Sequence, residues 1–255
     1  MKNKLEICCY SVESALIAER AGAHRVELCD NYMEGGTTPS YAMIKKAIEL
    51  LTIPINVIIR PRGGDFLYTD LEYEVIKKDL LYIKELNANG VVVGFLKKDG
   101  SIDIDKVNEI VELAKPMEVT FHRAFDMCKD PIIALNQLIK AGVKRILTSG
   151  QKNTALEGAE LISKLVNVAG DAIIIMPGSG VTANNITELQ EKTNAIEYHS
   201  SAMSFFKSNM EYFHNSINIG SSKNKDEFTK VIVDAQKVKG LLVKMNFSHL
   251  KTKRI

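Results

Sequence analysis

Two cysteines occupy matching positions in two short apolar segments near the start of the chain. Cys8 follows Glu6 by two residues, and Cys29 follows Glu27 by two residues. Because side chains alternate along a strand, each cysteine shares a face with its glutamate. Neighbouring strands lie about 4.8 Å apart, a spacing that would bring the two sulfur atoms together. Two thiolates so placed form a soft site selective for Cu(I), whereas two buried thiols could equally act as small apolar side chains.

The same alternation gathers further charged side chains on one face of the later apolar segments. That face carries Arg60, His122, Glu197 and His199 in addition to Glu6 and Glu27. Because an isolated charge is costly against an apolar helix layer, this face is expected to line the mouth of a site where opposite charges pair. A purely structural layer of ion pairs is the alternative.

Two arginines, Arg60 and Arg62, flank a proline that stiffens the backbone between them. A planar guanidinium binds a carboxylate or phosphate through two parallel hydrogen bonds, so the pair is a candidate clamp for a small anion. We assign to the same anion site the polar and glycine-rich residues Asp65, Arg123, Ser149, Gly178, Ser179, Gly180 and His199. The loop at 178–180 precedes a helix, where backbone N–H groups commonly bind phosphate, although a tight turn needs glycine equally.

The candidate acid or base is His122, because an imidazole titrates near neutral pH and a carboxylate can orient it. Glu27 or Glu6 would serve as its proton partner. Alternatively, His122 and His199 could bind a metal ion together with Glu197 or Glu27, although no diagnostic spacing marks such a site.

Eight short β-branched segments alternate with helical patterns, as parallel strands alternate with crossover helices. The predicted strands span residues 5–9, 25–29, 55–60, 90–94, 117–122, 145–148, 172–176 and 195–199. Helix starts are predicted by Ser11 as an N-cap, by Thr69-x-x-Glu72 and Thr154-x-x-Glu157 as capping boxes, and by Asp130-Pro131. Eight β/α units in about 250 residues predict a TIM-type (β/α)₈ barrel, an α/β fold in a single domain. A doubly wound sheet is the alternative, but no GxGxxG follows the first strand.

The barrel is expected to span residues 1–203. Residues 204–255 are expected to form a closing helix, at 226–238, and a basic C-terminal tail of the same domain. The apolar face of that helix would consist of Phe228, Val231, Ile232 and Ala235.

The composition is that of a globular protein, with 45% hydrophobic and 25% charged residues in a chain of 255. A formal charge of +2 argues against a nucleic-acid or membrane-surface partner, so we expect a small-molecule partner. No apolar stretch has the length of a signal peptide or a membrane span, which predicts a cytoplasmic protein. The four cysteines form no CxxC pair and are expected to be free thiols in that reducing compartment.

Two long motifs stand out, RPRGGDF at 60–66 and TFHRAFD at 120–126, together with the shorter LEICCYSVESA, EGGTTPS and EYHSSA. In these motifs and in their order, from residue 5 to about residue 202, the chain resembles the CutC family of copper homeostasis proteins. The resemblance implies a TIM-type barrel, a cytoplasmic setting and assembly into dimers or tetramers. It also implies copper handling, with Cu(I) bound by two cysteines that match Cys8 and Cys29.

Two functions are therefore considered. In the first, the protein binds and handles Cu(I) in the cytosol through Cys8 and Cys29. In the second, it is a barrel enzyme acting on a small carboxylate or phosphate anion, which Arg60 and Arg62 hold while His122 transfers a proton. Replacement of both cysteines would abolish the first function, and replacement of Arg62 by alanine would impair the second. Copper handling is the leading expectation because the resemblance supports it.

Overall fold

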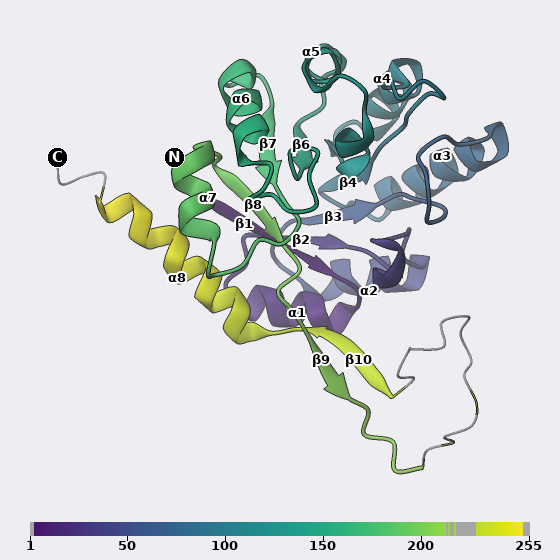
Figure 1. The fold of residues 1–255 in the computed structure, drawn as a ribbon. Coiled ribbons are helices and arrows are strands. Elements are labelled where there is room, and N and C mark those ends of the chain that lie inside the picture. The colour runs from purple at the N-terminus through teal and green to yellow at the C-terminus, as the bar shows by residue number, and fades with distance from the viewer. Residues whose placement is uncertain (1–2, 213, 215–216, 218–227, 252–255) are drawn as a thin grey trace.

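A ring of eight parallel strands forms the centre of the computed structural model, which describes residues 3–212, 214, 217 and 228–251 (Figure 1). The strands are β1 (Lys4–Cys9), β2 (Arg25–Leu28), β3 (Ile55–Ile58), β4 (Gly90–Val93), β5 (Glu118–Phe121), β6 (Arg145–Thr148), β7 (Ile174–Pro177) and β8 (Glu197–Ser200). Strands pair in chain order from β1 to β7, and β8 pairs with β1, so only the β7–β8 edge lacks a ladder among the described strands. The predicted TIM-type barrel is confirmed, and every predicted strand end lies within two residues of its position in the structure.

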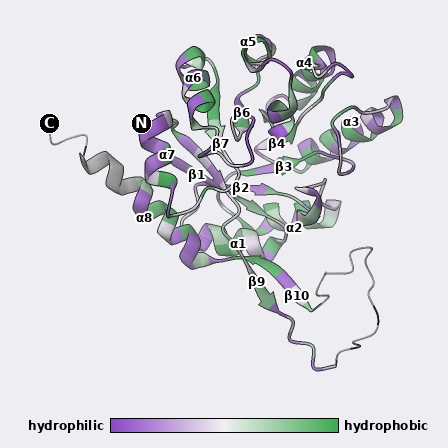
Figure 2. Ribbon diagram, in the orientation of Figure 1, coloured by the Kyte–Doolittle hydropathy of each residue, from purple (hydrophilic) through white to green (hydrophobic). Residues whose placement is uncertain are grey.

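Helices surround the strands on the outside of the ring (Figure 1). They are α1 (Val12–Arg20), α2 (Tyr41–Leu50), α3 (Asp70–Glu85), α4 (Ile104–Ala114), α5 (Pro131–Ala141), α6 (Ala159–Ala169) and α7 (Ile186–Thr193), with short 3₁₀ turns η1 (Tyr32–Glu34) and η2 (Arg123–Met127). In α3 the buried residues Tyr73, Ile76, Leu80 and Ile83 recur every three or four positions, which is one face of a helix. Figure 2 shows the resulting mixture of hydrophobic and hydrophilic residues on α3, α4 and α6. The apolar faces and the strands together bury the main core.

Three of the four predicted helix starts are confirmed. Ser11 accepts a hydrogen bond from the N–H of Ser14, Thr69 forms a complete capping box at the start of α3, and Asp130 caps α5 ahead of its first-turn proline. The side chains of these residues accept hydrogen bonds from N–H groups that the first helical turn leaves unpaired.

The fourth predicted start is wrong, because α6 begins after the motif. Thr154 and Glu157 exchange the two hydrogen bonds of a capping box, but the helix starts at Ala159. Gly158 lies between them, where a Cβ would be 1.9 Å from the carbonyl oxygen of Ser149. The loop after β6 therefore folds back on itself, so that Gly158 packs closely against Ser149 before α6 begins.

The closing helix lies later in the chain than predicted. Residues 226–227 are outside the described part of the chain, and Val231 and Ile232 belong to a strand, β10 (Thr229–Val233), which pairs antiparallel with β9 (Met203–Lys207). The β-branched run at 229–233 suits a strand, and β9 is the partner that the sequence analysis did not identify. Asp234 accepts hydrogen bonds from the N–H groups of Gln236 and Lys237, so the last helix, α8 (Ala235–Lys251), begins directly after it.

The C-terminal helix α8 packs against α7 and α1 on the outside of the barrel, and the β9–β10 hairpin projects from it (Figure 1). Val238, Leu241 and Met245 are buried there in the main core. Among the described helices, none combines the length and the apolar character needed to cross a membrane.

Candidate functional site

Two sulfur atoms lie side by side at the carboxyl end of the barrel. Cys8 Sγ, on β1, and Cys29 Sγ, directly after β2, are 3.6 Å apart. The N–H of Cys29 donates to the carbonyl oxygen of Cys9 at 2.9 Å, which continues the β1–β2 ladder and fixes the spacing of the two side chains. Both thiols are free and buried.

The surroundings distinguish the two sulfurs electrostatically. The hydrogen bond with Cys29 lowers the pKa of Cys8 well below its ordinary value of 9.0, and His199 and Tyr10 lower it further. Burial raises the pKa of Cys29 well above 9.0. Cys8 is therefore the more acidic thiol of the pair and the one that carries thiolate character.

A histidine and a glutamate complete the group around Cys8. His199 Nε2 lies 3.6 Å from a carboxylate oxygen of Glu27. Although burial alone would lower the pKa of His199, hydrogen bonds to Cys8 and Glu6 raise it well above 6.5. Burial raises the pKa of Glu27 well above 4.5. Cys8, Glu27 and His199 each offer one ligand atom, and these atoms lie within 4.8 Å of one another, close enough to hold one metal ion.

The buried Glu6 links this group to the interior of the barrel. One of its carboxylate oxygens accepts from His199 Nδ1 at 2.8 Å, and the other accepts from Arg25 Nε and, at 3.2 Å, from Asn56 Nδ2. Burial alone would raise the pKa of Glu6, but the charges of Arg25 and His199 hold it well below 4.5. Glu6 is therefore a fixed carboxylate that orients His199, and the structure does not bring it to His122.

A cavity of about 210 Å³ opens over Cys8, whose sulfur lies 3.6 Å from that of Cys29. Its lining combines apolar, cationic and titratable side chains from seven strand ends and loops. They are Cys8, Tyr10, Glu27, Gly35, Ile58, Arg60, Phe66, His122, Arg123, Leu147, Ser179, His199 and Ser201. Such a mixture of apolar walls and a few polar groups is typical of a small-molecule site.

Arg60 lines this cavity but spends most of its donors on the backbone. Its guanidinium donates to the carbonyl oxygens of Glu34 at 2.5 Å, Gly36 at 3.0 Å and Gly64 at 2.9 Å. It also lies 5.1 Å from the centre of the Phe66 ring. Arg60 Nε is buried and has no hydrogen-bond partner among the described residues. The Nε–H is thus a buried donor that these three hydrogen bonds do not use.

His122 is a neutral imidazole in the same cavity. Its Nδ1 accepts from the N–H of Ala124 at 3.1 Å, which leaves the ring proton on Nε2. Burial and then the charge of Arg60 lower the pKa of His122 to about 3. Nε2 is buried without a partner in the described part of the chain. A Cβ on Gly94 would lie 2.3 Å from the imidazole, so only glycine at that position admits the ring.

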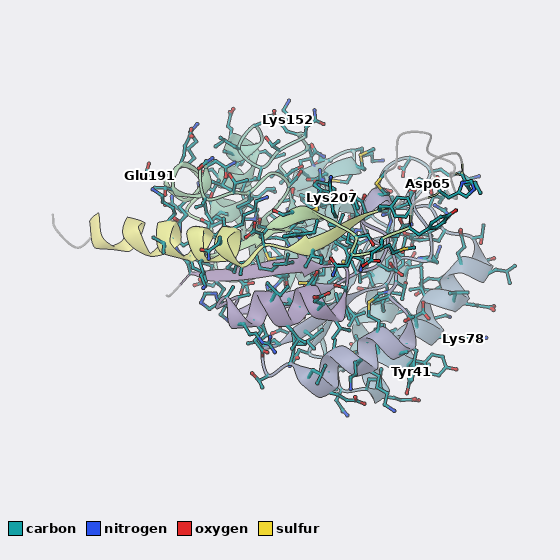
Figure 3. The ribbon with its side chains drawn as sticks, turned by 90° about the horizontal axis from the view of Figure 1, so that it is seen from below. Tyr41, Asp65, Lys78, Lys152, Glu191 and Lys207 are labelled. Carbon is teal, nitrogen blue, oxygen red and sulfur yellow. The ribbon has the colours of Figure 1, made fainter. Side chains whose placement is uncertain are left out.

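The other half of the expected arginine clamp lies away from the cavity. Arg62 is bound to Glu72 at 2.5 Å and to Asp65 at 3.0 Å, and neither Arg62 nor Asp65 lines the cavity. The Asp65 side chain is 72% exposed, at the edge of the molecule in Figure 3. These two residues hold the loop between β3 and α3 instead of facing Arg60.

Only some of the other residues expected at the anion site line the cavity. Arg123, which lines the cavity, pairs with Asp126 at 2.8 Å and donates to Ser149 Oγ at 3.0 Å. Ser149 itself is buried outside the lining. Ser179 lines the cavity with its backbone at φ 78°, and its hydroxyl donates to the carbonyl oxygen of Asn153.

The glycines beside Ser179 serve the turn. A Cβ on Gly178 would lie 2.4 Å from the Leu147 side chain, and Gly180 adopts φ 68°, a left-handed conformation that favours glycine. Neither glycine is among the lining residues.

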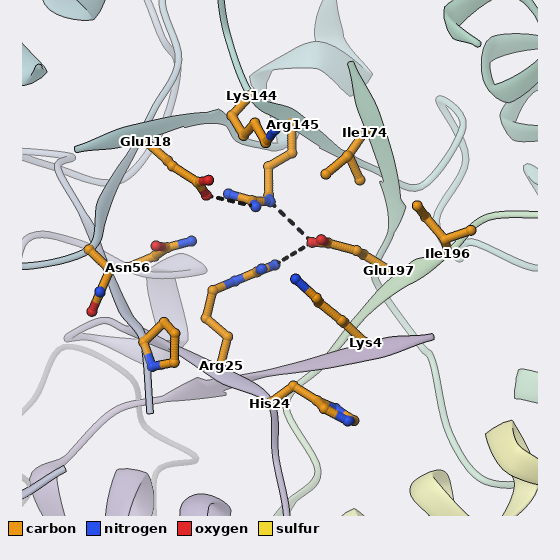
Figure 4. Close-up of a pocket in the computed structure, with 12 residues that line it drawn as sticks. Lys4, His24, Arg25, Asn56, Glu118, Lys144, Arg145, Ile174, Ile196 and Glu197 are labelled. Atoms are coloured by element: carbon orange, nitrogen blue, oxygen red, sulfur yellow. Dashed lines mark hydrogen bonds and ion pairs between the residues drawn. The ribbon is translucent and has the colours of Figure 1, made fainter. Parts of the chain in front are cut away.

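Glu197 is not at the mouth, contrary to the expectation from alternation. It opens β8 and accepts from Arg25 at 2.7 Å and from Arg145 at 3.1 Å, at the opposite, amino end of the barrel (Figure 4). The side chain does point inward, but alternation does not reveal the height of a residue along the barrel axis. The metal set of His122, His199 and Glu197 is therefore not assembled in the described structure.

Two buried arginines that pair with Glu197 were not predicted from the sequence. Arg25 and Glu27 are two residues apart, so alternation already placed Arg25 on the interior face. Arg145 opens the predicted strand at 145–148. Tyr10, which shares the parity of Cys8, was missed in the same way.

Comparisons with known proteins match most of the chain to one family. The model of the CutC family matches residues 3–204. A CutC family protein of Parabacteroides distasonis is 51% identical over 95% of this chain and 100% of its own length. The human copper homeostasis protein cutC homolog is 44% identical over 93% of this chain and 87% of its own.

Solved structures show the same relationship. The crystal structure of the copper homeostasis protein CutC of Streptococcus agalactiae superimposes with a TM-score of 0.75 at 35% identity, covering 78% of this chain and 98% of that one. Phosphoribosyl anthranilate isomerase of Thermotoga maritima shares only the fold, with a TM-score of 0.58 at 13% identity over 97% of this chain and 100% of that one. The chain belongs to the CutC family of copper homeostasis proteins.

Proposed function

We propose that this protein binds Cu(I) through Cys8 and Cys29 as part of copper handling in the cell. The observation that carries the proposal is the 3.6 Å separation of the two sulfur atoms. The lowered pKa of Cys8 favours its thiolate form, which is the form that binds metal. Thiolate ligands select Cu(I) over hard cations, and the relatives named for copper homeostasis are consistent with this cargo.

His199 is the third ligand in this proposal. Its Nδ1 is committed to Glu6 at 2.8 Å, so Nε2 is the nitrogen available to a metal ion. A carboxylate that holds the far nitrogen of a ligating histidine orients the ring and increases its basicity. Because the pKa values of His199 and Cys29 are raised well above their ordinary values, Cu(I) binding would compete with protons for both groups.

The test is an anaerobic Cu(I) competition titration against a coloured chelator. The wild-type protein should hold one Cu(I) per chain, and Cys8→Ser/Cys29→Ser should lose tight binding. The matched control is Cys9→Ser/Cys128→Ser, which removes the other two buried thiols and should bind as the wild type does. Equal affinity in wild type and Cys8→Ser/Cys29→Ser would contradict the proposal. A parallel Zn(II) titration checks selectivity, since zinc also accepts cysteine, histidine and carboxylate ligands.

The second candidate function is catalysis on a small anion in the same cavity. It is favoured by Arg60 Nε and His122 Nε2, two donors that are buried without partners among the described residues. A neutral histidine with its proton on Nε2 donates a hydrogen bond to a developing negative charge and is too weak an acid to lose that proton at neutral pH. Glu27 would then be the proton-transferring group, because its pKa is raised well above 4.5.

Acetate is a suitable probe for this second function. A titration followed by the NMR signals of the His122 imidazole should shift them at millimolar acetate if an anion binds between the two free donors. Arg60→Gln should remove the shift. Signals that do not move in the wild type would contradict an anion site in this cavity.

Cytoplasmic location and self-association belong to the same proposal. All four cysteines are free, including a pair whose sulfurs are 3.6 Å apart, which is compatible with a reducing compartment. Phe205 on β9 is 62% exposed and Met210 beyond it is 58% exposed, and exposed apolar groups of this kind favour association between copies. Light scattering after size exclusion should find a dimer or tetramer, and a monomer would contradict self-association.

A further inference from the structure

We propose that the amino end of the barrel is a second binding site, for a compact dianion that carries carboxylate or phosphate groups. A pocket of about 810 Å³ opens there among the first residues of the strands (Figure 4). This volume is within the usual range of small-molecule sites. Lys4, in its lining, precedes Cys8 by four residues on β1, which places the two cavities about 13 Å apart along that strand.

The charges of this pocket are unbalanced in favour of an anion. Its lining holds the cationic side chains of Lys4, Arg25, Lys144 and Arg145 and the carboxylates of Glu118 and Glu197. Even when Glu6 behind Arg25 is counted, the cations outnumber the carboxylates. A network that served only the fold would gain from pairing every charge, because unpaired cations in a concave site repel one another.

Three cationic donors in the pocket lack an acceptor. Arg25 donates from Nε and Nη2 to Glu6, Glu197 and the Met176 sulfur, which leaves Nη1 without a hydrogen bond to any described residue. The ammonium groups of Lys4 and Lys144 likewise form no hydrogen bond or ion pair within the described structure. Lys4 and Lys144 are exposed and hydrated at the pocket mouth, and Arg25 is buried behind them, so an anion that enters the pocket would meet cationic donors that no carboxylate of the protein already occupies.

The arrangement suits two negative charges better than one. In Figure 4 Lys144 lies beside Arg145 and Lys4 points into the pocket near Arg25, so the two ammonium groups flank the buried guanidiniums. Glu197 anchors both arginines, at 2.7 Å and 3.1 Å, and so fixes the floor of the pocket. A dianion carries one negative charge for each of the two lysines, whereas a monocarboxylate carries one charge for both.

Calorimetric titration with succinate and with inorganic phosphate, at constant ionic strength, tests the site. The wild type should bind one dianion per chain, and Lys4→Gln/Lys144→Gln should bind it about tenfold more weakly or worse, because two charge-assisted contacts are lost. The control is Lys78→Gln/Lys98→Gln, which changes the net charge equally at exposed positions; Lys78 lies at the periphery in Figure 3. Both variants replace surface lysines and leave the buried network intact.

The outcomes separate the possible ligands and locations. Binding of succinate alone identifies a carboxylate ligand, and binding of phosphate alone identifies a phosphate ligand; either result supports the site. Failure of the wild type to bind both anions, or an equal loss in the two lysine variants, would overturn it. Cys8→Ser/Cys29→Ser should still bind the dianion, since loss of binding there would move the anion to the carboxyl-end cavity.

Discussion

The two ends of the barrel use charged side chains in opposite ways. At the amino end, the guanidinium groups of Arg25 and Arg145 are anchored by Glu197, and Arg145 also pairs with Glu118 at 2.9 Å. At the carboxyl end, Arg60 Nε and His122 Nε2 are buried without partners among the described residues. Pairing removes the cost of burying a charge and fixes a geometry, whereas unpaired groups keep their capacity to bind. The paired guanidiniums of the amino end therefore form a rigid base beneath the exposed lysines of that pocket, and the carboxyl end keeps buried donors free.

Glu6 connects the two ends through a single carboxylate. One oxygen accepts from Arg25 in the amino-end network, and the other accepts from His199, which faces Cys8. The ion pairs at the base thus set the orientation of the imidazole beside the sulfurs. A substitution in the amino-end network is therefore expected to change the orientation of His199 at the proposed copper site.

The largest expected effect comes from removing the shared anchor of the base. Glu197→Ala leaves two buried guanidinium groups without their common carboxylate, which should lower the free energy of unfolding by about 3–5 kcal/mol. Urea denaturation measures this loss. The control is Glu118→Gln, whose side chain is 46% exposed and should cost at most about 1 kcal/mol. A similar loss of unfolding free energy in the two variants would contradict the view that the buried Glu197, and not the exposed Glu118, anchors the two arginines.

The next effect is a change in the pH dependence of stability. The pKa of Glu6 is held below 4.5 in the folded protein, so its contribution is present above pH 4.5 and is lost as the pH falls through the folded value. Glu6→Gln should therefore lower the free energy of unfolding by about 2–3 kcal/mol at pH 6, and this difference from wild type should shrink towards pH 3. Urea denaturation across that range measures it, with exposed Glu13→Gln as the control. A difference that stays constant with pH would refute the role of Glu6.

The smallest effect concerns protonation at the carboxyl end. The pKa of His122 is lowered to about 3, whereas the pKa of His199 is raised well above 6.5. Nitrogen-15 NMR should therefore detect a neutral His122 with its proton on Nε2 throughout pH 5–7, and a His199 that loses its proton at a much higher pH than His122 does. Protonation of His122 with a midpoint near pH 6.5 would show that its surroundings are wetter and less cationic than the structure indicates.

The alternation of side chains along a strand, which repeats every two residues, correctly predicted which side chains point into the barrel. Alternation identified Glu6, Cys8, Glu27 and His199 as interior residues. A shift of one residue would turn these side chains towards the helices, and the buried apolar residues between them fix the strand in one orientation. Alternation also brought Cys8 and Cys29 to adjacent strands. The eight β/α units predicted the barrel for the same reason, since each strand carries its own local signal.

Alternation does not predict how far along the barrel axis a side chain lies. Glu197 and His199 share a face of β8, yet one lies at the base and the other beside Cys8, because strand stagger sets the level. The partners Arg25 and Arg145 come from other strands, so their pairing with Glu197 depends on the closed sheet. The misplacement of the last helix has a similar cause, because β10 is a strand only through its pairing with β9.

The most direct test of the copper proposal is X-ray absorption at the copper edge of the Cu(I)-loaded protein. Two sulfur ligands are expected in the wild type, from Cys8 and Cys29 at 3.6 Å from each other, and one nitrogen ligand from His199, which lies within 4.8 Å of Cys8. The Cys29→Ser variant should then show one sulfur ligand fewer, while Cys128→Ser should match the wild type. A copper shell without sulfur, or the same sulfur number in wild type and Cys29→Ser, would contradict a site built on this pair of cysteines.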